Sequence, residues 1–141
     1  MTLPSSRMTK FELVLFAWTA LNFAVGVWVL FTGKFQVYGA GLAPFLPLAI
    51  GLPAAGLLLW QLLKPTRAAL LFGTLFWALQ IASARLPETL YKFRVGLSVD
   101  FRVTDNPNYI VAVNLLAVVV TIMFAIAAAR RRAAKPQAAT T

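Results

Sequence analysis

The sequence predicts an all-α membrane protein: a four-helix transmembrane bundle with a short external β-hairpin between the third and fourth helices. Of the 141 residues, 60% are hydrophobic and only 12% are charged, whereas a soluble domain carries about 25% charged residues. The charges are clustered, and the four uncharged runs between them are each close to the roughly 20 residues that cross a bilayer as a helix. Before the last run, the stretch YKFRVGLSVDFRV alternates strictly between apolar and polar residues, which is the period of a β-strand.

Each predicted helix follows from one uncharged run. The first run is longer than the apolar core of a secretory signal, and Glu12 stands at its start, so we expect it to remain as a helix. In the second run, prolines and glycines favour a helix that begins near Pro44 or Pro47. The fourth helix is expected to take Asp105 or Asn106 as its cap. The predicted spans are residues 12–32, 44–63, 67–85 and 107–129, inside a single membrane domain (11–132) between an N-terminal segment (1–10) and a disordered tail (133–141).

Basic residues set the expected orientation. Eight lysines and arginines lie near the two termini and in the link between the second and third spans, against five in the other segments. Because basic residues favour the cytoplasmic side, both termini should be cytoplasmic and the hairpin external, as in a bacterial inner membrane protein. The net charge of +9 is therefore assigned to the borders of the lipid bilayer, and we expect no contact with nucleic acid.

The absence of cysteine and histidine excludes most enzyme chemistry. It removes histidine-bound haem, Cys/His zinc sites, thiol catalysis and every nucleophile activated by histidine. The four acids are not paired at helical spacing: Glu12 is expected to lie solvated at one membrane interface, and Glu88, Asp100 and Asp105 in the external loop. We therefore predict no enzyme activity, no metal and no cofactor. An enzyme that uses these external carboxylates on a lipid or a quinone ranks last among the functions considered.

Three amide side chains are the candidate polar interior of the bundle: Asn22, Gln80 and Asn114. They lie in the first, third and fourth predicted spans and could converge inside one bundle. Such side chains usually form hydrogen bonds between membrane helices, each contributing about 0.6–2 kcal/mol. The alternative is that they line the path of a small solute.

The alternating stretch is predicted to form a hairpin over residues 90–104, because a single strand of this length would not let the chain return to the bilayer. The residues GLS at positions 96–98 would form a three-residue turn, which keeps the apolar side chains on one face. This face is the candidate strand for docking a partner, and three surfaces can cover it: the protein's own bundle, another protein or the membrane surface. Its residues are Tyr91, Phe93, Val95, Val99, Phe101 and Val103.

These predictions favour a small polytopic membrane protein that acts as an accessory or assembly subunit of a membrane complex. The small size, the missing catalytic residues and the ordered external strand all point to this role. Its partner would be another membrane protein or a second copy of the chain in a homo-oligomer. The alternative function is a small oligomeric transporter or channel for a small solute, with the three amides along the path.

Overall fold

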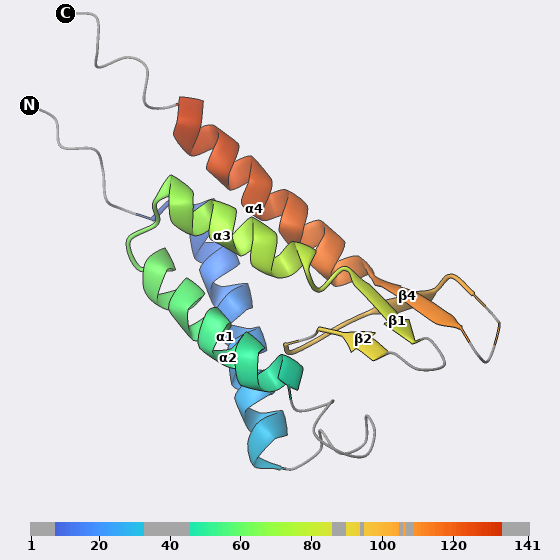
Figure 1. The fold of residues 1–141 in the computed structure, drawn as a ribbon. Coiled ribbons are helices and arrows are strands. Elements are labelled where there is room, and N and C mark those ends of the chain that lie inside the picture. The colour runs from blue at the N-terminus through green and yellow to red at the C-terminus, as the bar shows by residue number, and fades with distance from the viewer. Residues whose placement is uncertain are drawn as a thin grey trace, which may run out of the picture.

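Four helices and a four-stranded sheet make up the described part of the chain in a computed structural model (Figure 1). The structure describes residues 8–32, 46–85, 90–93, 95–104, 106 and 109–133. The helices are α1 (Lys10–Phe31), α2 (Leu46–Leu62), α3 (Arg67–Ala78) and α4 (Leu115–Ala133). The strands are β1 (Ala82–Arg85), β2 (Leu90–Lys92), β3 (Asp100–Arg102) and β4 (Ile110–Asn114).

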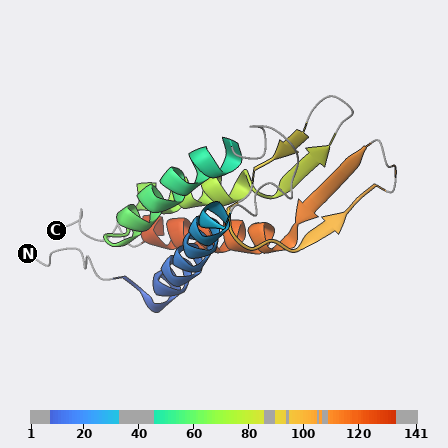
Figure 2. The ribbon, with the colours of Figure 1, turned by 90° about the horizontal axis from the view of Figure 1, so that it is seen from below.

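The sheet projects from one side of the helices (Figure 1, Figure 2). β1 follows α3, and β4 leads directly into α4, so the sheet continues the pair of helices α3 and α4. The start of α1, the end of α2, the start of α3 and the end of α4 lie together at the end opposite the sheet. Six basic residues therefore gather at that end: Lys10, Lys64, Arg67, Arg130, Arg131 and Arg132.

Side-chain caps fix where two of the helices begin. Thr9 and Glu12 form a capping box at the start of α1, in which Glu12 N donates to Thr9 Oγ1 (3.2 Å) and Thr9 N donates to Glu12 Oε2 (2.8 Å). At α3, Ala69 N donates to Thr66 Oγ1 (3.1 Å), which satisfies one of the N–H groups that a helix start leaves free. α2 begins at Leu46, within the interval predicted from its prolines.

α1 is long and apolar enough to cross a membrane, with a mean hydropathy of 2.0 over its most apolar window. Among the described residues it is the one helix that meets both conditions. α2 and α3 are apolar but shorter, and α4 carries three arginines in its last turn. The core helix of a soluble protein and a signal sequence would meet the same conditions of length and composition.

α3 ends earlier than predicted. The predicted span 67–85 is helical to Ala78, after which a turn through Leu79 and Gln80 leads into β1. Ile81 N donates to the carbonyl of Ala78 (3.2 Å), so the helix tightens before the chain extends. The predicted end is wrong because a short apolar segment fits a strand as well as a helix.

α4 starts later than predicted, for a related reason. The predicted span 107–129 becomes helical only at Leu115, and the residues before it form β4. The sequence IVAV in β4 is rich in β-branched residues, which favour a strand. Asn114 then caps the helix, because its Oδ1 accepts from Ala117 N (3.3 Å). The cap is therefore Asn114, and the predicted caps at positions 105 and 106 are wrong.

All strand pairs in the sheet are antiparallel, in the order β2–β1–β4–β3. The central pair aligns Ala84 with Val111, and β3 lies on β4 with Phe101 opposite Val113. The predicted hairpin over residues 90–104 is wrong, because β2 and β3 lie at opposite edges of the sheet. Each pairs with a strand whose residues were predicted to be helical. Alternation identifies a strand and its two faces, but it does not identify the partner strand.

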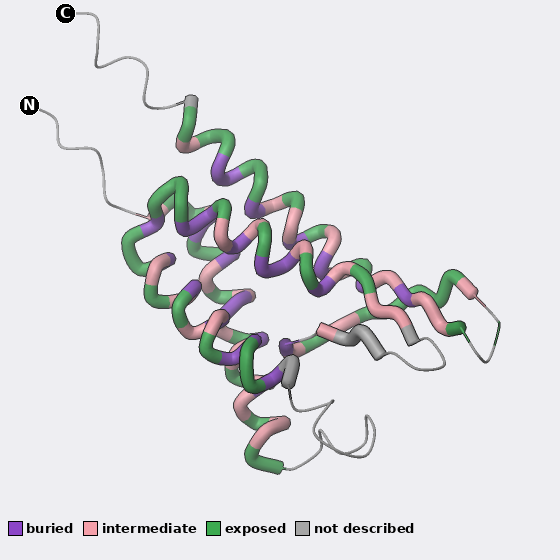
Figure 3. The backbone as a smooth tube through the Cα atoms, in the orientation of Figure 1, coloured by how far each residue is buried: buried purple, intermediate pink, exposed green. Residues whose placement is uncertain are grey.

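The core lies between the facing sides of the helices, where the buried positions of Figure 3 gather. Phe124 of α4 is fully buried against Gly73 of α3, where an added Cβ would lie 2.3 Å from Phe124 Cε1. This close approach requires glycine and holds the two helices together. In contrast, all three residues of β3 are exposed.

Candidate functional site: a strand held by three amides

Residues 95–99, which we call the crossing segment, carry the chain toward β3 from the opposite edge of the sheet. They are not strand residues of the sheet, so their N–H groups need other acceptors. Figure 1 shows the segment leaving the sheet and passing close to α1 and α2.

Three buried amide side chains accept hydrogen bonds from alternate N–H groups of the crossing segment. Asn22 lies in the middle of α1, Gln80 in the turn after α3 and Asn114 at the end of β4, and each residue is only 1% exposed. The bonds run from Val95 N to Gln80 Oε1 (2.9 Å), from Leu97 N to Asn22 Oδ1 (2.7 Å) and from Val99 N to Asn114 Oδ1 (3.3 Å).

The three bonds come from alternate residues, the spacing at which N–H groups share one side of an extended chain. The segment is not a regular strand, because Gly96 within it has a φ of +87°, but the amides supply acceptors that a neighbouring strand would otherwise supply. A buried N–H without an acceptor costs about 1–3 kcal/mol, which gives the amides a structural role. The structure thus brings all three predicted polar residues to one segment, and protein N–H groups occupy their oxygen atoms.

The nitrogen atoms of the amides differ in their surroundings. Asn22 Nδ2 donates to the carbonyl of Trp18 (2.9 Å), one turn earlier in α1. Gln80 Nε2 is buried without a partner among the described residues, as is the indole Nε1 of Trp77, three positions before it. Unpaired buried donors are rare in proteins, and nothing in the described residues accounts for these two.

Val95 and Gly96 pack the crossing segment against α1 and α2. Val95 is buried in a notch between Gly26 of α1 and Gly51 of α2, where an added Cβ at Gly51 would lie 2.3 Å from Val95 Cγ2. Gly96 has a φ of +87°, and a Cβ there would lie 2.7 Å from the Cα of Asn22. Only glycine fits both this left-handed conformation and this contact. The residue predicted to turn a hairpin therefore lets the backbone approach α1.

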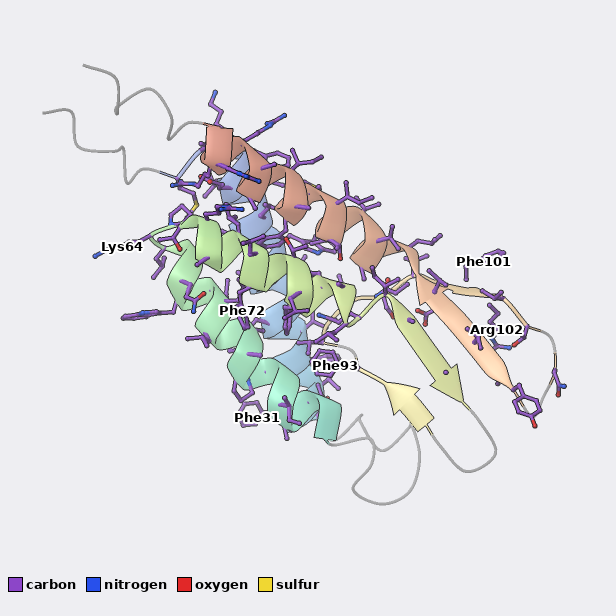
Figure 4. All side chains as sticks on the ribbon, turned by 45° about the horizontal axis from the view of Figure 1, so that its top comes forward. Phe31, Lys64, Phe72, Phe93, Phe101 and Arg102 are labelled. Atoms are coloured by element: carbon purple, nitrogen blue, oxygen red, sulfur yellow. The ribbon has the colours of Figure 1, made fainter. Side chains whose placement is uncertain are left out.

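The first half of the predicted docking strand faces the protein's own helices. Phe93 is half-buried, and its ring lies edge-on to that of Phe76, with 6.2 Å between centroids. In Figure 4 the labelled Phe93 points toward the bundle, away from the tip of the sheet. Val95 is buried in the glycine notch. The side chain of Tyr91 lies outside the described part of the structure.

The second half of the docking strand is exposed and belongs to a wider apolar surface. Val99, Phe101 and Val103 are 52%, 63% and 58% exposed. Directly opposed residues of an antiparallel sheet share a face, so β4 and β1 add further apolar residues to this one. None of its members is buried. We call this surface the apolar sheet face: Ala82, Ala84, Val99, Phe101, Val103, Val111 and Val113.

The contribution of β4 to this face differs from the prediction. Val111 and Val113 lie in a predicted transmembrane helix, in which their side chains would point in different directions. The signal that indicates a strand is the β-branched run before Asn114, a residue that favours a helix cap. The reverse face carries Ser83, Asp100 and other polar residues.

Glu12 is buried, so the prediction that its side chain is solvated is wrong. Its side chain is 3% exposed and forms an ion pair with Arg131 of α4. Arg131 donates through Nε to Glu12 Oε1 and through Nη2 to Glu12 Oε2 (2.9 Å), the two-bond geometry that arginine forms with a carboxylate. Beside this pair, the guanidinium of Arg130 lies 5.3 Å from the ring centroid of Phe11. These contacts join the start of α1 to the end of α4.

Among the described residues, no three His, Cys, Asp or Glu side chains lie close enough together to hold a metal ion. The chain matches no family model, no curated protein and no solved structure. The function is therefore inferred from the crossing segment and from the apolar sheet face.

Proposed function

We propose that the chain is a small integral membrane protein of a bacterial inner membrane, with both termini in the cytoplasm. The distribution of side chains supports this location. Large apolar side chains are exposed on all four helices, among them Leu21, Leu57, Leu75 and Ile122, whereas Glu12 and the three amides are buried. Water disfavours so large an apolar surface, but lipid does not. The basic residues gathered opposite the sheet support the orientation.

In that membrane we propose that the protein acts as an accessory or assembly subunit, and the apolar sheet face carries this proposal. The face continues along an exposed side of α4, because Leu115 follows β4 directly and is itself exposed. Ile122 and Ile126 are exposed seven and eleven positions further on, which places them on the same side of the helix. One apolar surface therefore runs from the helix onto the sheet.

The proposed occupant of this surface is a membrane protein whose span continues into an apolar external segment. Between its arginines and Leu115, an upright α4 covers about 22 Å of the roughly 30 Å of hydrocarbon. Phe101 then lies near the outer boundary, and Val103 with Val111 lies beyond it. Lipid tails do not reach these outer side chains, so water would face them unless another protein covers them.

A path for a solute is less well supported. The oxygen atoms of Asn22, Gln80 and Asn114, which would line such a path, already accept from the crossing segment. A solute that displaced the segment would break these three hydrogen bonds, each with a net contribution of about 0.5–1.5 kcal/mol. We therefore rank transport second.

Photo-crosslinking from the apolar sheet face tests the accessory role. A photoreactive phenylalanine analogue replaces Phe101 in the full chain, in native membranes, and the adducts are identified by mass spectrometry. The matched control carries the same group at Arg102, the next residue, which lies on the reverse face. We expect a single adduct, with one other membrane protein, from position 101 and no such adduct from position 102.

A second variant separates docking from folding. Phe101→Ser with Val103→Ser removes two exposed apolar side chains, each contributing about 1.5–3 kcal/mol when fully buried. The fraction of chain held in the complex should fall about tenfold or more, while the amount of chain in the membrane stays the same. Leu71→Ser, on the exposed side of α3, should leave the complex intact. An adduct between two copies of this chain, or a monomer that gives no adduct, would reject the accessory role.

A further inference from the structure

A groove of about 190 Å³ opens between α1 and α4. It is lined by residues near the start of α1 and by the first half of α4. Its walls are apolar, and no charged side chain lines it. The lining residues include Val14 and Trp18 from α1 and Leu116, Val120 and Met123 from α4.

The same two helices end in a basic cluster. Glu12 neutralises Arg131, so among the described residues the net positive charges at this end of α1 and α4 are the exposed Lys10, Arg130 and Arg132. Among the described residues no acid pairs with any of these three. An apolar groove beside unpaired basic side chains combines the two chemical features of a site for an amphipathic anion.

We propose that the groove binds one acyl chain of an anionic phospholipid whose phosphate lies against Lys10 and Arg130. Arg130 follows Met123 by seven residues, about two turns, which places it on the same side of α4 and about 10 Å along the helix. Lys10 precedes Val14 by four residues, about one turn of α1, and lies on the same side of that helix. Phosphate groups lie about 5–8 Å outside the hydrocarbon, and lysine and arginine side chains extend toward them. A lipid held at these two residues can therefore place its chain in the groove. This inference rests on the membrane location proposed above, but not on the proposed partner.

Charge selects the headgroup in this site. The groove walls accept any acyl chain, so a preference among lipids must come from the basic end. A lysine or arginine close to anionic lipid strengthens binding about fivefold. The exposed Lys10 and Arg130 should therefore favour an anionic over a zwitterionic phospholipid by about 25-fold.

Trp18 reports on the groove, because bromine atoms on an acyl chain quench tryptophan fluorescence on contact. The test protein is the full chain with Trp28→Phe and Trp60→Phe, so that Trp18 and the fully buried Trp77 remain. It is reconstituted into zwitterionic vesicles with increasing fractions of a brominated phospholipid, either anionic or zwitterionic. We expect half-maximal quenching of Trp18 at an about 25-fold lower mole fraction of the anionic lipid.

Matched charge variants locate the headgroup. Lys10→Gln with Arg130→Gln should remove the difference between the two lipids. Lys64→Gln with Arg67→Gln removes the same charge from the turn between α2 and α3, at the same end of the molecule. This control should keep the preference, because the turn is not part of the groove.

The remaining outcomes would overturn either the lipid site or the membrane location. Equal quenching by the two lipids, or a preference that survives loss of both Lys10 and Arg130, would overturn the lipid site. Inorganic phosphate that abolishes the preference would assign the basic end to free phosphate and would also overturn it. A companion protein with Trp18→Phe keeps the exposed Trp28 and Trp60. If no brominated lipid quenches that protein, the membrane location itself is refuted.

Discussion

Gly96→Ala should detach the crossing segment from α1 and destabilise the fold. An alanine at this position takes a φ of +87°, in the left-handed region that costs an L-residue about 1–2 kcal/mol. Its Cβ would lie 2.4 Å from Asn22 Oδ1 and 2.7 Å from Asn22 Cα, and the second atom is backbone that cannot rotate away. Moving the segment outward breaks the bond from Leu97 N to Asn22, which costs about 1–3 kcal/mol more. The free energy of unfolding should fall by about 2–5 kcal/mol.

Gly56→Ala is the matched control for this prediction. A Cβ at Gly56 would meet Phe23 at 3.5 Å, an ordinary contact, and the position lies inside α2, where alanine is favoured over glycine by about 0.5–1 kcal/mol. Both variants are unfolded from mild detergent by titration with a denaturing detergent, and tryptophan fluorescence gives the free energy. A Gly96→Ala protein within about 0.5 kcal/mol of the parent would refute the reasoning.

Three further substitutions test the contacts around the crossing segment and the ion pair. Asn22→Leu removes the acceptor of the partly buried Leu97 N–H and should lower the free energy of unfolding by about 1–3 kcal/mol in the same titration; an unchanged value would show that the bond contributes nothing. Gly51→Ala should destabilise the fold through its clash with Val95, and adding Val95→Ala should recover part of the loss, with a coupling of about 0.5–3 kcal/mol in a double-mutant cycle. If the effects of the two substitutions are additive, Gly51 and Val95 are not coupled, and the packing of Val95 against Gly51 is contradicted. Glu12→Gln breaks a nearly buried ion pair and should lower the melting temperature, followed by circular dichroism, more than Arg132→Gln does at an exposed position. Equal shifts would contradict a role for the pair.

The long uncharged runs are the part of the fold that the sequence predicts best. The predicted first and second spans, 12–32 and 44–63, correspond to helices Lys10–Phe31 and Leu46–Leu62. Charged or helix-breaking residues flank both runs, so the limits of the two helices can be predicted directly from the sequence. The three amides could be grouped for a similar reason, because few other polar residues interrupt the apolar runs. That they bind one backbone segment was not visible, since it depends on how the chain returns to the bundle.

The strands next to α3 and α4 could not be predicted from local pattern. Residues 82–85 and 110–114 continue the apolar runs of the two helices without a charge that would separate them. Their extended form is stabilised by mutual pairing, with Ser83 opposite Ala112, over a separation that local periodicity does not report. Once this central pair exists, β2 pairs with the outer edge of β1 and β3 pairs with the outer edge of β4. These pairings take the place of a local hairpin between β2 and β3. The Glu12–Arg131 pair was hidden in the same way, by the 119 positions between its members.

The amides have a consequence for the docking surface. Opening the crossing segment would break three hydrogen bonds, each with a net contribution of about 0.5–1.5 kcal/mol. Val99, the first residue of the exposed stripe, is itself bound to Asn114, and its carbonyl accepts from Leu115 N (2.9 Å) at the start of α4. The apolar sheet face is therefore fixed to the helix that continues it before any partner arrives. A surface held in this way loses little conformational entropy on binding. The buried amides, predicted as a possible solute path, would then have a different role. They hold the crossing segment in place, and the segment in turn fixes the apolar sheet face for binding.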